Sequence, residues 1–178
     1  MRMTPQLAPL AVAVALLGCG EIVDVDPGPL GGHFTISDGS ASQEYSAQED
    51  GVICTAVTAL DGTPTLFVDF KSLRNGATGI LHLTAGPYSA EPSVYDAKGY
   101  ESPELESLCG GGGACWRVWW RPSADIEYFS APMAPACLLH VATNDGVVAG
   151  KFECAQLYPD ELAITNGSFT CVLARRLP

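Results

Sequence analysis

Short apolar or alternating segments, each bounded by turn-forming residues, follow one another along most of this chain. In residues 64–71, Leu66, Val68 and Phe70 share one face and Asp69 and Lys71 share the other, which is the two-residue period of a strand. Strands are predicted at 33–37, 51–59, 64–71, 78–84, 115–121, 126–130, 136–143, 147–156, 161–165 and 168–174. The succession predicts an all-β domain: an antiparallel β-sandwich, with a small β-barrel as the alternative.

Three local signals add detail to this expectation. Ser102 offers an N-cap and Pro103 a first helical residue, which predicts one short helix near 102–108. Asp145-Gly146 and Asn166-Gly167 each lie between strand-like segments, where such pairs favour the type I′ turn of a β-hairpin. Two tight hairpins are therefore predicted in the C-terminal part of the chain.

The N-terminal residues predict an export signal. After Arg2, the apolar segment from Leu7 to Leu17 is shorter than the about 20 residues that a helix needs to span a bilayer, but it has the size of a signal-peptide core. The residues that follow, Leu16-Leu17-Gly18-Cys19, resemble the lipobox of bacterial lipoproteins. The predicted organisation is a signal peptide at 1–18, a lipidated Cys with a flexible tether at 19–32, and a single β domain at 33–178.

The lipobox resemblance implies a location and a partner. In that family the Cys receives a diacylglyceryl group and becomes the new N-terminus, so Cys19 would hold the protein to the lipid bilayer. Gly20 stands where an Asp would retain a lipoprotein in the inner membrane, which favours the outer membrane of the bacterial cell envelope.

The cysteine count agrees with this interpretation. The chain has 7 Cys, an odd number that needs explaining in an exported protein. If Cys19 is lipidated, six remain for disulfides in an oxidising compartment. Cys109–Cys115 would close a glycine-rich loop, and the register of an Asp145-Gly146 hairpin places Cys137 opposite Cys154. Cys54–Cys171 follows by elimination.

The C-terminal segments Gly150–Cys154 and Ile164–Cys171 resemble the end of small uncharacterised envelope lipoproteins. This resemblance implies a disulfide-bonded all-β lipoprotein domain and brings no catalytic residue with it.

Charge and motifs exclude several classes of function. The chain has 9 Lys and Arg against 20 Asp and Glu, a net charge of −11, which argues against nucleic acid as a partner. His33, His82 and His140 lack the spacing of a zinc site, and no G-x-S-x-G motif is present. We therefore predict no catalytic residue, no metal, no cofactor and no enzymatic activity.

The segment 115–121 holds the candidate binding platform. On a strand, Trp116, Val118 and Trp120 share the face that we expect to enter the core. The opposite face then presents Arg117, Trp119 and Arg121 to solvent. A local stack of Arg on Trp is the favoured interpretation, and an aromatic platform for a glycan or an envelope protein is the alternative.

Three functions follow, from different classes. The leading hypothesis is a membrane-anchored, non-enzymatic interaction or structural module, which a filled core with flat faces would favour. The second is a β domain that binds a glycan or small ligand, which an open cavity of several hundred Å³ would favour. The third is a secreted hydrolase, which requires a Ser or Asp beside His82 or His140 within a cleft.

Overall fold

The computed structural model describes residues 28–58, 62, 64–74, 79–89, 91–97, 115–130 and 137–175. Several predictions lie outside these residues: the signal peptide, Cys19 and most of the tether, the helix near 102–108, and the side chains of the Cys109–Cys115 pair. Within the described residues almost all regular structure is strand, so the all-β prediction is confirmed. No helix there is long and apolar enough to cross a membrane.

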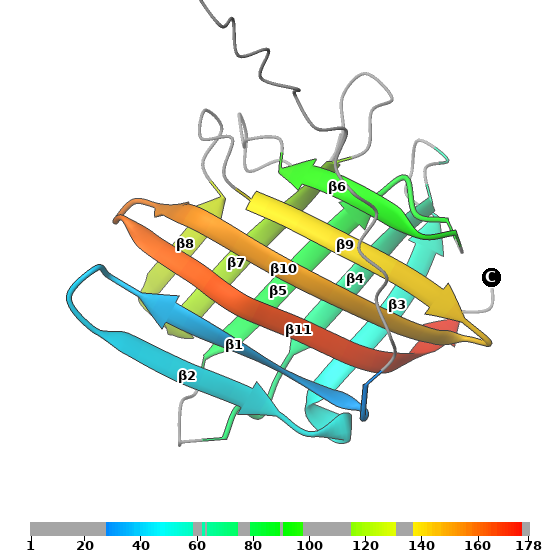
Figure 1. The fold of residues 1–178 in the computed structure, drawn as a ribbon, viewed down its shortest axis with the longest axis horizontal. Coiled ribbons are helices and arrows are strands. Elements are labelled where there is room, and N and C mark those ends of the chain that lie inside the picture. The colour runs from blue at the N-terminus through cyan, green and yellow to red at the C-terminus, as the bar shows by residue number, and fades with distance from the viewer. Residues whose placement is uncertain are drawn as a thin grey trace, which may run out of the picture.

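The regular elements follow one another along the chain and are labelled in Figure 1. The strands are β1 (Gly31–Ser37), β2 (Ser42–Ala47), β3 (Val52–Thr58), β4 (Pro64–Phe70), β5 (Ile80–Gly86), β6 (Ser93–Ala97), β7 (Cys115–Ser123), β8 (Ile126–Ser130), β9 (Cys137–Asn144), β10 (Val147–Tyr158) and β11 (Leu162–Arg175). A single 3-10 turn, η1 (Glu49–Gly51), joins β2 to β3 in the described part of the chain.

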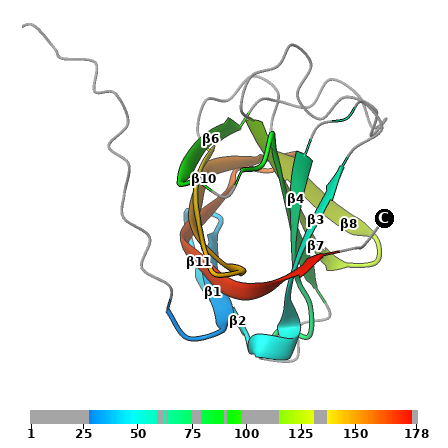
Figure 2. The ribbon, with the colours of Figure 1, turned by 90° about the vertical axis from the view of Figure 1, so that its right-hand side faces the viewer.

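The strands form two facing layers that belong to one hydrogen-bonded sheet (Figures 1 and 2). The front layer of Figure 1 has the order β2-β1-β11-β10-β9-β6, and the rear layer has the order β3-β4-β5-β7-β8. The layers are joined by the pairings β11–β3, β6–β7 and β8–β10. Most pairings are antiparallel, as predicted, while β11–β3 and β6–β7 are parallel.

Aromatic side chains fill the space between the layers. Trp116, Trp120, Tyr95, Phe34 and Phe70 are among the largest fully buried residues. The Phe34 ring stacks on Tyr45 at 5.1 Å and meets the Phe70 and Trp120 rings edge-on at 5.4 Å. Such contacts between large rings contribute about 0.5–1.5 kcal/mol each beyond the burial of apolar area.

The predicted hairpin at Asp145-Gly146 is present. Both residues have positive φ, 50° and 80°, as a type I′ turn requires. The turn sets the register of β9 on β10, so that Cys137 faces Cys154. That pair forms a disulfide with Cα atoms 3.9 Å apart.

The disulfide predicted by elimination is also present: Cys54 of β3 joins Cys171 of β11, with Cα atoms 5.9 Å apart. This bond lies across the parallel pairing that connects the rear layer to the front layer. It therefore reinforces one of the junctions between the layers.

The prediction of a hairpin at Asn166-Gly167 is wrong. Strand β11 runs on through these residues, and its register shifts there against both β1 and β10, which identifies a β-bulge. Asn166 has φ of 53°, a conformation that suits a bulge as well as a type I′ turn. At Gly167 a Cβ atom would lie 2.5 Å from the carbonyl oxygen of Phe152, so glycine is required by the close approach of β10.

Two strands were not predicted. In β2, only Tyr45 and Ala47 are buried, so the segment shows little apolar alternation. In β6, Tyr95 is fully buried and donates a hydrogen bond to the carbonyl of Pro87 at 3.2 Å, but the strand is only 5 residues long. Both strands are stabilised by pairing with neighbouring strands, and this pairing cannot be seen in the local sequence.

Candidate functional site

The alternation predicted for β7 is confirmed. Trp116, Val118 and Trp120 point into the core and are 0–1% exposed. Trp119 is half-buried on the outer face of the rear layer, together with Arg117 and Arg121. The predicted binding platform therefore lies on the outside of the molecule.

The predicted stack of Arg on Trp119 is present for Arg121, whose guanidinium carbon lies 6.0 Å from the centroid of the indole ring. The Arg121 side chain also donates hydrogen bonds to the carbonyls of Ser123 and Ala124, at 3.3 and 2.8 Å, and lies 3.7 Å from the Glu127 carboxylate. These contacts tie it to the β7–β8 hairpin, so Arg121 holds one side of the Trp119 ring in place.

Trp119 is one member of a row of rings that crosses the outer face of the rear layer and ends on β10, the front-layer strand that pairs with β8. The strand register places His82 of β5 beside Trp119, and Phe129 of β8 beside both Trp119 and Tyr158 of β10. The ring centroids are 6.2 Å apart for His82 and Trp119, and 5.3 Å apart for Phe129 and Tyr158. Phe67 of β4 extends the row at 5.6 Å from His82. We call these five side chains the ring row.

Sequence reasoning found only Trp119 and missed the rest of the ring row. Alternation places Phe67 on the outer face of its strand, and that signal was available. The strand order β4-β5-β7-β8, with β10 beside β8, could not be predicted from the sequence, because it depends on which strands pair. The row also ends in an exposed ring, since Tyr158 is 53% exposed.

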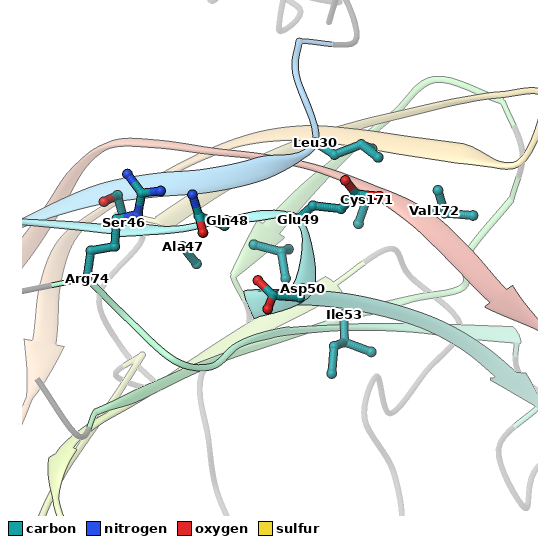
Figure 3. Close-up of a pocket in the computed structure, with 11 residues that line it drawn as sticks. Leu30, Ser46, Ala47, Gln48, Glu49, Asp50, Ile53, Arg74, Cys171 and Val172 are labelled. Carbon is teal, nitrogen blue, oxygen red and sulfur yellow. The ribbon is translucent and has the colours of Figure 1, made fainter. Parts of the chain in front are cut away.

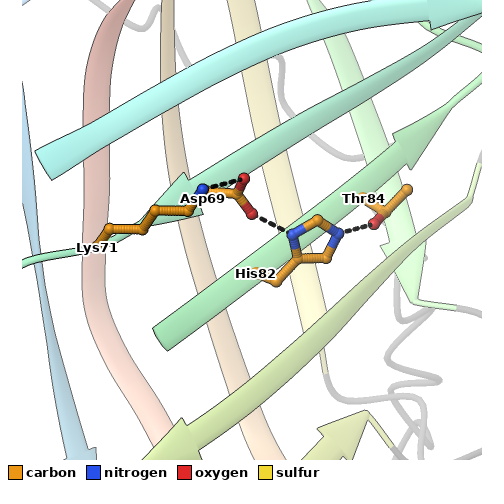
Figure 4. Close-up of polar contacts among 4 residues, drawn as sticks. All are labelled: Asp69, Lys71, His82 and Thr84. Carbon is orange, nitrogen blue, oxygen red and sulfur yellow. Dashed lines mark hydrogen bonds and ion pairs between the residues drawn. The ribbon is translucent and has the colours of Figure 1, made fainter. Parts of the chain in front are cut away.

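A chain of polar contacts fixes the imidazole within the ring row (Figure 4). His82 Nδ1 contacts a carboxylate oxygen of Asp69, and His82 Nε2 lies 3.0 Å from the hydroxyl of Thr84. Lys71 Nζ lies 3.4 Å from the other carboxylate oxygen of Asp69. Partial burial raises the pKa of Asp69, but the hydrogen bond and charge of His82, with the charge of Lys71, outweigh that effect and lower it.

The contacts Asp69–His82–Thr84 follow the carboxylate–imidazole–hydroxyl order of a hydrolytic triad, but the strand geometry argues against hydrolysis at Thr84. Thr84 is only 5% exposed, and it is paired in register with Phe67 on one side and Arg117 on the other. The backbone amides around it serve the sheet ladder, so they are not directed toward an oxyanion. The contacts therefore orient His82 within the sheet face.

A separate cavity of about 910 Å³ opens where β2 and η1 face β3 and β11 (Figure 3). Its lining combines polar side chains with an apolar wall: Leu30, Ser46, Ala47, Gln48, Glu49, Asp50, Val52, Ile53, Arg74, Cys171 and Val172. Glu49 and Asp50 come from η1, and Arg74 is held beside β2 by its backbone hydrogen bond to the Ser46 carbonyl. In the described part of the chain no ion pair joins Arg74 to either carboxylate.

The three histidines do not come together. His82 lies on the rear layer, whereas His33 and His140 lie on different strands of the front layer. Among the described residues, no group of three or more His, Cys, Asp or Glu side chains has the arrangement of a metal site.

Comparison with protein-family models, with curated proteins and with solved structures gave no match.

Proposed function

We propose that this chain is a lipid-anchored lipoprotein of the bacterial cell envelope whose β domain binds a glycan through the ring row and catalyses no reaction. The observation that carries the proposal is the alignment of five rings, from Phe67 to Tyr158, on one outer sheet face. Rings aligned along a sheet face suit an extended polymer better than a compact substrate.

The chemistry of the face matches that of a sugar chain. The C–H groups on one side of a pyranose pack against an aromatic ring, and its hydroxyls reach polar groups at the ring edges. Asp69, Arg117 and Arg121 lie on the same outer face as the rings. Because Arg121 and the His82 contacts hold two of the rings in place, little side-chain entropy is lost on binding.

The anchoring part of the proposal depends on the lipobox and on the cysteines. Four of them, Cys54, Cys137, Cys154 and Cys171, are joined in the two disulfides predicted for an exported domain. If Cys109 and Cys115 also pair, Cys19 is left over from the 7 Cys. An acidic chain with a net charge of −11 gains nothing from anionic lipid, so acyl chains at Cys19 are the anchor that we propose.

Binding to soluble oligosaccharides from the bacterial cell wall tests the glycan proposal. Calorimetry with the detergent-extracted wild-type protein should give saturable binding, and Trp119→Ala should weaken it at least about tenfold, as the loss of an aromatic anchor does. Leu138→Ala is the matched control, because it removes an exposed apolar side chain (38%) from the front layer. Equal weakening by both variants, or no saturable binding by the wild type, would contradict the proposal.

The cavity in Figure 3 favours a second candidate function, the binding of a small molecule. A carboxylate pair and a guanidinium without a mutual ion pair, beside an apolar wall, match a ligand that carries both an amino and an acidic group. Free amino acids should then raise the melting temperature of the wild type and not that of Arg74→Gln. If none of them raises it, this second function is excluded.

A further inference from the structure

A second cavity, of about 420 Å³, opens on the outside of the front layer and does not include any residue of the ring row. The polar side chains that line it are Ser46, His33, Ser168, Thr170 and Lys151. Four glycines, at positions 28, 31, 32 and 150, also line it and contribute no side chain that would fill it. Its size is that of a site for a small ligand or a headgroup.

The strand register brings four of the polar side chains into one line. Ser46 of β2 faces His33 of β1, His33 faces Ser168 of β11, and Ser168 faces Lys151 of β10. Residues directly opposite one another on a sheet have Cβ atoms about 4.5–5.5 Å apart, so a single group of atoms can contact several of them. The four therefore form a strip of polar side chains along one edge of the cavity.

The contacts within the strip leave donors available. The Ser168 hydroxyl lies 3.2 Å from His33 Nδ1. When Ser168 donates to that nitrogen, the ring proton sits on His33 Nε2, and the exposed imidazole presents an N–H to solvent. Lys151 is also exposed and supplies the positive charge of the strip.

The charge of the cavity is unlike that of the rest of the chain. The chain has a net charge of −11, yet none of the described residues that line this cavity carries a carboxylate. A lysine point charge surrounded by hydroxyl and imidazole donors is an arrangement that suits phosphate oxygens. A neutral sugar would make no use of the Lys151 charge, and a cation would be repelled by it.

We infer that this cavity is a binding site for a phosphate group, with Lys151, His33 and Ser46 as its donors and the Ser168 hydroxyl orienting His33. The phosphate belongs either to a soluble phosphate ester or to a phospholipid headgroup. The headgroup as a source rests on the proposed lipid anchor. Gly28 lines the cavity and follows Cys19 by 9 residues, which span at most about 30 Å, so the anchor would keep the cavity within that distance of the lipid.

The three histidines provide built-in reporters for the test. In the full chain, imidazole NMR signals are followed while methyl phosphate is added at constant ionic strength. The His33 signals should shift and saturate, while those of His82, on the opposite layer, should stay in place. Lys151→Gln should weaken the binding about tenfold, and Ser168→Ala should weaken it less, because Lys151 supplies the charge whereas Ser168 only orients His33. Lys71→Gln, which removes the same charge from the rear layer, should leave it unchanged.

A second arm distinguishes the two sources. Bicelles of phosphatidylcholine, with and without phosphatidic acid, replace methyl phosphate. A His33 shift on bicelles that needs phosphatidic acid identifies the headgroup, whereas a shift with methyl phosphate and with neither kind of bicelle identifies a soluble ester. The inference is overturned if neither source shifts His33, if His82 shifts equally, or if Lys71→Gln weakens binding as much as Lys151→Gln. The ring row contributes only the unshifted His82 signal to this readout and no phosphate contact, so the failure of phosphate binding and the failure of glycan binding are separate results.

Discussion

Trp119 and Trp120 are neighbours in the chain but lie in opposite environments. Trp120 is 1% exposed within the core, so Trp120→Ala should lower the free energy of unfolding by about 3–5 kcal/mol. Trp119 is half-buried on the outer face, and Trp119→Ala should cost about 1 kcal/mol, mainly its stacking with Arg121. Urea unfolding of both variants measures the difference. A loss of several kcal/mol at Trp119 would show that this ring serves the fold and not a surface.

The Asp69–His82 contact predicts how stability depends on pH. Because the pKa of Asp69 is lowered in the folded state, its stabilisation is fully present above the unfolded value, about 3.9, and is lost as the pH falls through the folded value. Asp69→Asn should therefore be less stable than the wild type at pH 7, and the gap in the free energy of unfolding should narrow as the pH falls below about 3.9. Asp125→Asn, in the exposed β7–β8 turn, is the control. A gap that does not change with pH would contradict the assignment.

At the scale of elements, the two disulfides close loops of very different length. Cys54–Cys171 spans 117 residues and joins the layers, whereas Cys137–Cys154 spans 17 residues within one hairpin. All four cysteines are buried, at 0–4% exposure, so the loss of packing on Cys→Ala substitution is similar. Removing the long-range bond should cost about 4–5 kcal/mol and removing the local bond about 3 kcal/mol, measured by urea unfolding. The reverse order would show that loop length does not determine their contributions.

The same elements show what a sequence can and cannot predict. Alternation predicted β4 and β7, and turn chemistry predicted the β9–β10 register down to Cys137–Cys154, because both signals are local. The prediction of a hairpin at Asn166-Gly167 failed because β1 and β10 both pair with β11 on either side of the bulge. These pairings keep β11 extended through the two residues. The ring row was missed because it depends on strand pairing. Phe129 of β8 lies between Trp119 of β7 and Tyr158 of β10, and the sequence does not show that β8 pairs with both strands.

At the scale of the whole molecule, the proposed anchor predicts a chemical modification. When the chain is expressed in a bacterium supplied with labelled palmitate, the wild type should carry the label and enter the detergent phase. The reason is that each methylene of an acyl chain at Cys19 contributes about 0.8 kcal/mol of binding free energy when it is buried in lipid or detergent. Cys19→Ser should lose the label and the detergent partitioning. Label retained by the Cys19→Ser variant would contradict the lipobox interpretation, and so would an unlabelled, freely soluble wild type.

We expect the outer face of the rear layer to be the recognition surface. Photo-crosslinking in intact cells tests this most directly, with benzoylphenylalanine placed at Phe129 in the ring row or at Leu138 on the front layer. We expect crosslinks to glycan from position 129 and none from position 138. Glycan crosslinks from position 138 alone, or equally from both positions, would contradict it.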